Sequence, residues 1–144
     1  MWCLIMDFKL WLENVNIDAD KVLQIIQQSP QFRSVKVSPE YWERYAERWG
    51  IKGTFVWTRL PVKEVVDLIN NKLYIQISKS INQQEVQNKI KSGSRNPMII
   101  GRSNSGGIPY AILDGSHSLD AAYHAGEEWI DAIVPSNSEF ASKD

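Results

Sequence analysis

Hydrophobic and polar positions change their period several times in the last third of the chain. Residues 110–113 form an uninterrupted apolar run, which predicts a buried strand. Asp114-Gly115 breaks this run, and the next apolar residues recur at helical spacing up to Gly126, a residue typical of helix ends. The apolar residues of this predicted helix are Leu119, Ala122 and Tyr123. Residues 129–134 are again apolar, so the predicted order is strand, tight polar turn, short helix and strand.

The same pattern predicts further short strands and helices between residues 53 and 113. They are expected at 54–60, 62–70, 73–77, 82–91, 98–101 and 108–113. Asn82 and Glu85 resemble a capping box at the start of the second of these helices. Residues 103–107 consist of Ser, Asn and Gly, which predicts a hairpin turn.

Residues 1–50 are predicted to be helical, with helices at 8–12, 18–28 and 38–50. Ser38-Pro39 favours a helix start, because a capping hydroxyl precedes a proline at the first helical position. Four aromatic residues share one face of that helix: Tyr41, Trp42, Tyr45 and Trp49. This face either packs in the core or forms a surface for a protein partner or for stacked bases.

Length and composition predict one globular domain. The chain has 144 residues, of which 43% are hydrophobic and 23% charged, as is ordinary for a soluble protein. We expect a compact α+β domain over residues 53–135, preceded by a helical N-terminal extension over residues 1–52 that packs on it. Residues 136–144 are small and polar and are expected to form a flexible tail.

Charge and cysteine content favour a cytoplasmic protein. The net charge of −1 provides no overall attraction to nucleic acid or membranes, although a local basic patch is still compatible with it. The single cysteine, Cys3, cannot form an internal disulfide, which fits a reducing compartment. Residues 1–6 are apolar but too few for a signal peptide or a membrane span. No membrane partner is therefore expected.

Three sequence boxes resemble those of the ParB/sulfiredoxin superfamily. Residues 114–122, Asp-Gly-Ser-His-Ser-Leu-Asp-Ala-Ala, are similar to its turn-and-helix signature and are followed by Ala-Gly and an apolar strand. Residues 93–100 resemble its Gly-x-x-x-Pro-Ile box, and residues 59–65 its opening Ile-Pro-Val segment. The superfamily includes the nucleotide-binding domain of ParB partition proteins, sulfiredoxin, free-serine kinases and ParB-like nucleases. The resemblance implies a ParB/sulfiredoxin-like domain with a small mixed sheet.

The chain departs from the superfamily at two positions of the turn. Relatives usually carry there an arginine that contacts phosphate, and this chain has Ser118 in its place. Sulfiredoxin has its catalytic cysteine two residues earlier, where this chain has Ser116. Sulfiredoxin activity is therefore not expected.

A phosphate site is predicted around the turn, because the first N–H groups of a helix are unpaired and can bind an anion. The predicted phosphate-binding residues are Gly93, Ser94, Arg95, Gly115, Ser116 and Ser118. The section between Glu85 and Asp114 has no carboxylate but four cations: Lys89, Lys91, Arg95 and Arg102. This section is either part of the phosphate site or a solvated basic face. We expect Arg95 to replace the cation lost at Ser118.

Asp114 and His117 are the predicted catalytic residues. Histidine can donate or accept a proton near neutral pH, although a lone histidine is also common as a packing or capping residue. Asp114 either caps the turn or, as the kinase relatives imply, acts as a base or a Mg²⁺ ligand. His124 follows His117 by seven residues, which suits no standard metal pair, so His124 is expected to be structural and no resident metal site is predicted.

Two hypotheses of function follow. In the first, the protein binds a nucleotide or DNA phosphate, with Mg²⁺ accompanying ATP or CTP, and carries out nucleotide hydrolysis, phosphotransfer or nuclease chemistry. In the second, it is a catalytically degraded member of the fold that acts as a regulator or inhibitor by binding a protein through the aromatic face of residues 38–50. A plasmid or phage accessory role fits either hypothesis by analogy.

Overall fold

The structure is a computed structural model and describes residues 16–29, 32, 36–69, 73–75, 83–93, 96–103 and 109–141. Several predictions lie wholly or mostly outside these residues: the helix at 8–12, the hairpin turn at 103–107, and the site residues Ser94 and Arg95.

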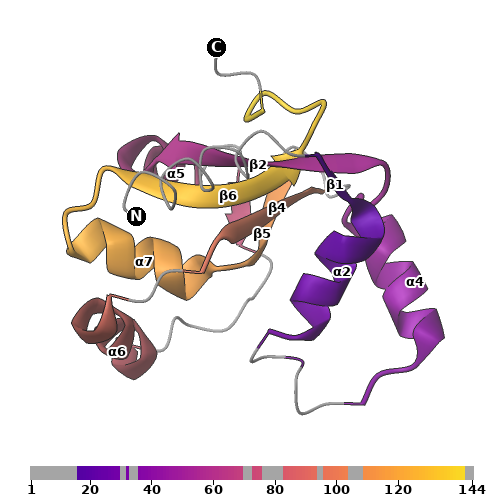
Figure 1. Ribbon diagram of the computed structural model, residues 1–144, viewed down its shortest axis with the longest axis horizontal. Coiled ribbons are helices and arrows are strands. Elements are labelled where there is room, and N and C mark those ends of the chain that lie inside the picture. Colours follow the sequence, from indigo (N-terminus) through magenta and orange to yellow (C-terminus); the bar gives the residue numbers. More distant parts are fainter. Residues whose placement is uncertain are drawn as a thin grey trace, which may run out of the picture.

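A six-stranded mixed sheet forms the centre of the described structure (Figure 1). Its strands are β1 (Asn16–Asp18), β2 (Thr54–Pro61), β3 (Leu73–Ile75), β4 (Met98–Arg102), β5 (Tyr110–Asp114) and β6 (Trp129–Pro135). They lie side by side in the order β1-β2-β6-β4-β5-β3. The β3–β5 and β4–β6 pairs are parallel, and the other pairs are antiparallel.

Helices cover both faces of this sheet. They are α2 (Ala19–Gln27), α4 (Pro39–Arg48), α5 (Val62–Leu68), α6 (Gln83–Ser92) and α7 (Ser116–His124). Because side chains alternate along a strand, β5 divides its apolar residues between two clusters: Ala111 and Leu113 pack with α2 and α4, while Tyr110 and Ile112 pack with α5 and α7. Helix α6 packs against α7 (Figure 1). No helix in the described part of the chain is long and apolar enough to cross a membrane.

The mixed α and β composition is confirmed, and so are the strands and helices predicted after residue 53, as far as the described residues show them. The N-terminal part differs from the prediction in one respect. Residues 16–18, expected to precede or begin a helix, form strand β1, whose Asp18 pairs with Thr54 of β2. The described residues of α2 and α4 bury Val22 and Tyr45 against the same sheet. They therefore form one layer of the domain.

The segment that follows β6 also differs from the prediction. Residues 136–141 were expected to begin a flexible tail, yet Ser138 and Phe140 are buried. The Ser138 hydroxyl donates to the Pro135 carbonyl at 2.6 Å, and the Phe140 ring packs edge-on against Tyr110 at a centroid distance of 4.8 Å. One aromatic anchor is thus enough to hold a polar segment on the core.

Candidate functional site

The turn between β5 and α7 has the predicted form. Strand β5 ends at Asp114, and Gly115 takes a left-handed backbone conformation with φ of 89° as the N-cap of α7. One carboxylate oxygen of Asp114, Oδ1, accepts the N–H of Gly115 at 3.0 Å. This bond fits the capping interpretation of Asp114 and fixes its carboxylate at the start of the helix.

The segment that precedes β4 lies directly against this turn. The backbone N–H of Asn96 donates to Oγ of Ser118 at 3.0 Å. A Cβ atom on Gly115 would lie 2.8 Å from Cα of Met98 and 2.9 Å from the carbonyl oxygen of Pro97, closer than side chains tolerate. The two chain segments therefore meet backbone to backbone, which only glycine permits at this position.

Burial divides the predicted site residues into two groups. Ser118 is 1% exposed and Ser116 6% exposed, whereas Asp114, Gly115 and His117 are half-buried. The Ser118 hydroxyl, predicted to bind phosphate, instead accepts a backbone N–H and lies below the surface. The part of the turn that solvent can reach is thus formed by Asp114, Gly115 and His117. Gly93, which follows α6, is exposed and takes a left-handed backbone conformation.

The sheet separates cationic residues that are close together in the sequence between Glu85 and Asp114. In the β4–β5 pair Ile99 lies opposite Asp114, while Arg102 lies opposite Tyr110 at the other end. Arg102 lies three positions along the strand from Ile99, which amounts to about 10 Å. The Arg102 guanidinium donates to Oδ1 of Asn137 at 2.7 Å and lies over the Tyr110 ring. Arg102 therefore belongs to the far end of the strand pair and not to the turn. Lys91 is exposed at the end of α6.

Half of the aromatic face of α4 is part of the core. Tyr45 and Trp49 are buried, Trp42 is half-buried and Tyr41 is 40% exposed. Phe32 packs edge-on against Trp42 with ring centroids 4.9 Å apart. The packing interpretation is therefore confirmed for Tyr45 and Trp49, whereas Tyr41 and Trp42 keep part of this face exposed.

The environment of the Tyr45 side chain on α4 affects its ionisation. Its hydroxyl is buried and has no hydrogen-bond partner in the described structure. Burial raises the pKa of Tyr45 well above its usual range, and the neighbouring Tyr41 and Asp114 raise it further.

Among the described residues, no three His, Cys, Asp or Glu side chains lie close enough together to hold a metal ion. His124 lies on α7 with its Nε2 3.4 Å from Oδ1 of Asp120, one helical turn away. Its side chain is 53% exposed, so His124 is a surface residue that does not join His117.

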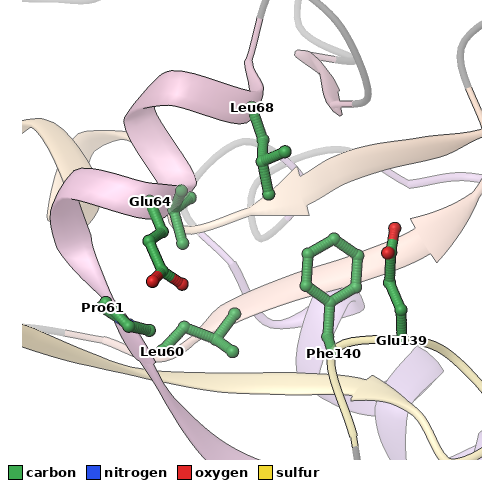
Figure 2. A pocket seen from close by; sticks show the side chains of 7 residues that line it. Leu60, Pro61, Glu64, Leu68, Glu139 and Phe140 are labelled. Carbon is green, nitrogen blue, oxygen red and sulfur yellow. The ribbon is translucent and has the colours of Figure 1, made fainter.

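A small hollow beside α5 contains two carboxylates, Glu64 and Glu139 (Figure 2). Leu60, Leu68 and Phe140 form much of its wall, and its volume is about 70 Å³. Figure 2 shows Glu64 and Glu139 on opposite sides of the Phe140 ring. Ligand pockets usually enclose a few hundred Å³ or more, which makes this hollow too small for a substrate.

Comparisons with protein-family models, with curated proteins and with solved structures found no match.

Proposed function

We propose that the protein binds a phosphate group of a nucleotide or of DNA at the start of α7. The observation that supports this proposal best is the contact between the two sequence boxes. Asn96 is hydrogen-bonded to Ser118, and Gly115 lies against Pro97 and Met98. In the ParB/sulfiredoxin superfamily, which the sequence resembles, the equivalent boxes border the nucleotide site.

The chemistry of the turn suits a phosphate. The first turn of an α-helix presents N–H groups without intrahelical partners at the positive end of the helix dipole. Gly115 has no side chain to obstruct a phosphate oxygen, and the half-buried His117 can donate a hydrogen bond to it. Lys91, exposed at the end of the neighbouring α6, adds a positive charge near this side of the domain.

Asp114 supplies the carboxylate of the proposed site. Mg²⁺ is commonly held by one or two carboxylates together with water and the phosphates of its nucleotide. One carboxylate at the turn thus fits a Mg²⁺ ion that ATP or CTP brings with it, and Asp114 is the residue that would hold it. In hydrolysis, phosphotransfer or phosphodiester cleavage, His117 would donate or accept the proton.

The second candidate function is that of a regulator that binds another protein and has lost the chemistry of the fold. One observation favours it. Ser118 stands where relatives have an arginine, and its buried hydroxyl accepts the backbone N–H of Asn96, so this position supplies no cation. From the aromatic face of α4 only Tyr41 and Trp42 could serve this hypothesis, because Tyr45 and Trp49 are buried in the core.

Isothermal titration calorimetry with ATP, CTP and a short DNA, each with and without Mg²⁺, tests the proposal. We expect saturable binding that His117→Ala weakens by about tenfold or more, as loss of a charge-assisted or otherwise strong hydrogen bond does. His124→Ala is the matched control, since it removes an exposed histidine from the other end of α7. Equal affinity in the two variants would contradict the role of His117. Absence of binding from the folded protein would favour the regulator.

A further inference from the structure

Two large aromatic side chains stand exposed at the end of α7 and the start of β6. Tyr123 is 48% exposed and Trp129 is 49% exposed. Figure 1 shows this end of the domain at the edge that lies away from α2 and α4. The helical spacing predicted Tyr123 to share the packed face of Leu119 and Ala122, but only the latter two are buried. An exposed pair of aromatic rings is unusual and is typical of interaction surfaces.

The two rings line a groove of about 430 Å³, termed the Tyr123–Trp129 groove. Pro61 and Lys63 lie along it, and Glu127 and Glu128 complete it from the loop between α7 and β6. Its volume is within the range of binding pockets that hold a side chain or a small organic group.

The backbone around the groove is fixed by hydrogen bonds. The Val62 N–H donates to the Glu128 carbonyl at 2.9 Å, and the Glu127 N–H donates to the Ala122 carbonyl at 2.9 Å. Trp129 is the first residue of β6 and pairs with Pro61 of β2. The rings are therefore attached to a rigid frame, which reduces the entropy lost when a partner binds.

Charge indicates what kind of group the groove accepts. Its lining carries two carboxylates, Glu127 and Glu128, and one ammonium, Lys63. The two carboxylates outnumber the ammonium, so the lining has a net negative charge and attracts cations.

We propose that the Tyr123–Trp129 groove binds a basic segment of a partner protein. An arginine or lysine side chain of the partner would lie over the face of Trp129 or Tyr123 and be attracted by its π-electrons. Glu127 and Glu128 would interact with the same positive charge. Tyrosine and tryptophan are also the residues most often found at the energetic centre of protein interfaces.

This groove is distinct from the proposed phosphate site. Tyr123 follows Ser116 by seven residues on α7, so the two sites are about 10 Å apart along the helix. They also carry opposite demands for ligand charge. Each proposal can therefore fail without the other.

Fluorescence anisotropy tests the groove with a fluorescein-labelled peptide in which arginine alternates with leucine. A second peptide with citrulline in place of arginine keeps the shape and removes the charge. We expect saturable binding of the arginine peptide, with the citrulline peptide and the Trp129→Ala and Tyr123→Ala variants each weaker by about tenfold or more. Tyr41→Ala removes an aromatic side chain of similar exposure from α4 and should leave the affinity unchanged.

Two further variants keep the test decisive. Trp129→Phe retains an aromatic face and should keep most of the affinity even if Trp129→Ala is poorly folded. Glu128→Gln leaves the backbone bond to Val62 intact and should weaken binding most at low salt.

Four results would overturn the proposal. They are equal binding of the two peptides, unchanged affinity in Trp129→Ala, no binding at any soluble peptide concentration, and self-association in the ultracentrifuge that Trp129→Ala abolishes. The last result would assign the groove to a second copy of the chain.

Discussion

Removing the Tyr45 hydroxyl should stabilise the protein. Tyr45 is 5% exposed, and its hydroxyl is buried with no hydrogen-bond partner in the described structure. A buried polar group that makes no hydrogen bond costs roughly 1–3 kcal/mol. Tyr45→Phe removes this group and keeps the ring, which packs edge-on against Trp42 at 5.4 Å. We therefore expect the free energy of unfolding to rise by about 1 kcal/mol, and Tm by roughly 3 °C.

Urea unfolding followed by far-ultraviolet circular dichroism measures this change directly. Tyr41→Phe is the control, because Tyr41 is 40% exposed and water can solvate its hydroxyl, so its stability should stay within about 0.5 kcal/mol of the parent protein. A loss of 1 kcal/mol or more in Tyr45→Phe would refute the reasoning. It would mean that the hydroxyl makes a stabilising hydrogen bond.

The same substitution should change the response to alkaline pH. Burial, with help from Tyr41 and Asp114, raises the pKa of Tyr45 above its ordinary value of 10.0. As the pH rises through 10.0, the unfolded chain loses the phenolic proton while the folded chain keeps it. The contribution of Tyr45 to stability is thus complete below that pH and falls above it. Unfolding curves of Tyr45→Phe should therefore decline less than those of the parent protein above pH 10. Equal decline would contradict the raised pKa.

Three further substitutions test the packing around the site by urea unfolding. Gly115→Ala should lower the free energy of unfolding by about 2 kcal/mol or more, because the new Cβ would meet backbone atoms at 2.8 Å. Gly53 has a similar φ but no atom within 4 Å of such a Cβ, so Gly53→Ala should lose only about 1 kcal/mol. Equal losses in the two variants would count against the close contact at Gly115. Ser118→Ala should lose about 1–2 kcal/mol, since the Asn96 N–H would lack its acceptor, and an unchanged stability would argue against that bond. Phe140→Ala should lose about 3 kcal/mol, and a loss below 1 kcal/mol would show that residues 136–141 are not part of the core.

Local sequence signals were sufficient for most elements after residue 53. The apolar run before Asp114, the glycine that follows it and the helical spacing up to Gly126 all belong to one continuous stretch. These local signals were enough to predict β5, the turn and α7. The turn was therefore predictable in form, and so was a backbone N–H bond accepted by the Asp114 carboxylate.

Elements that depend on distant partners were not predictable in the same way. Strand β1 has only three residues, too few for a periodic pattern, and it exists because β2 provides a pairing edge. Phe140 is a single apolar residue in a polar segment, and its burial depends on Tyr110, which lies thirty positions earlier.

The candidate site shows the same limit at the level of single side chains. Ser118 was assigned to phosphate from its place in the motif, yet its hydroxyl accepts an N–H from Asn96, twenty-two positions away. Arg102 was grouped with Lys91 by sequence proximity, but strand β4 carries it to the end of the sheet where it binds Asn137. Charge and motif position identified candidate residues for the phosphate site. Which of these residues lie at the turn depends on the register of the sheet, which the sequence alone does not give.

Nuclear magnetic resonance of the ¹⁵N-labelled protein during titration with ATP and Mg²⁺ tests the central claim most directly. We predict saturable shifts that are largest for the amides of Gly115, Ser116 and His117 at the start of α7. The amides of Tyr123 and Trp129, at the other end of that helix, should change little. Saturable shifts elsewhere in the domain, with the amides of the turn unmoved, would contradict the phosphate site.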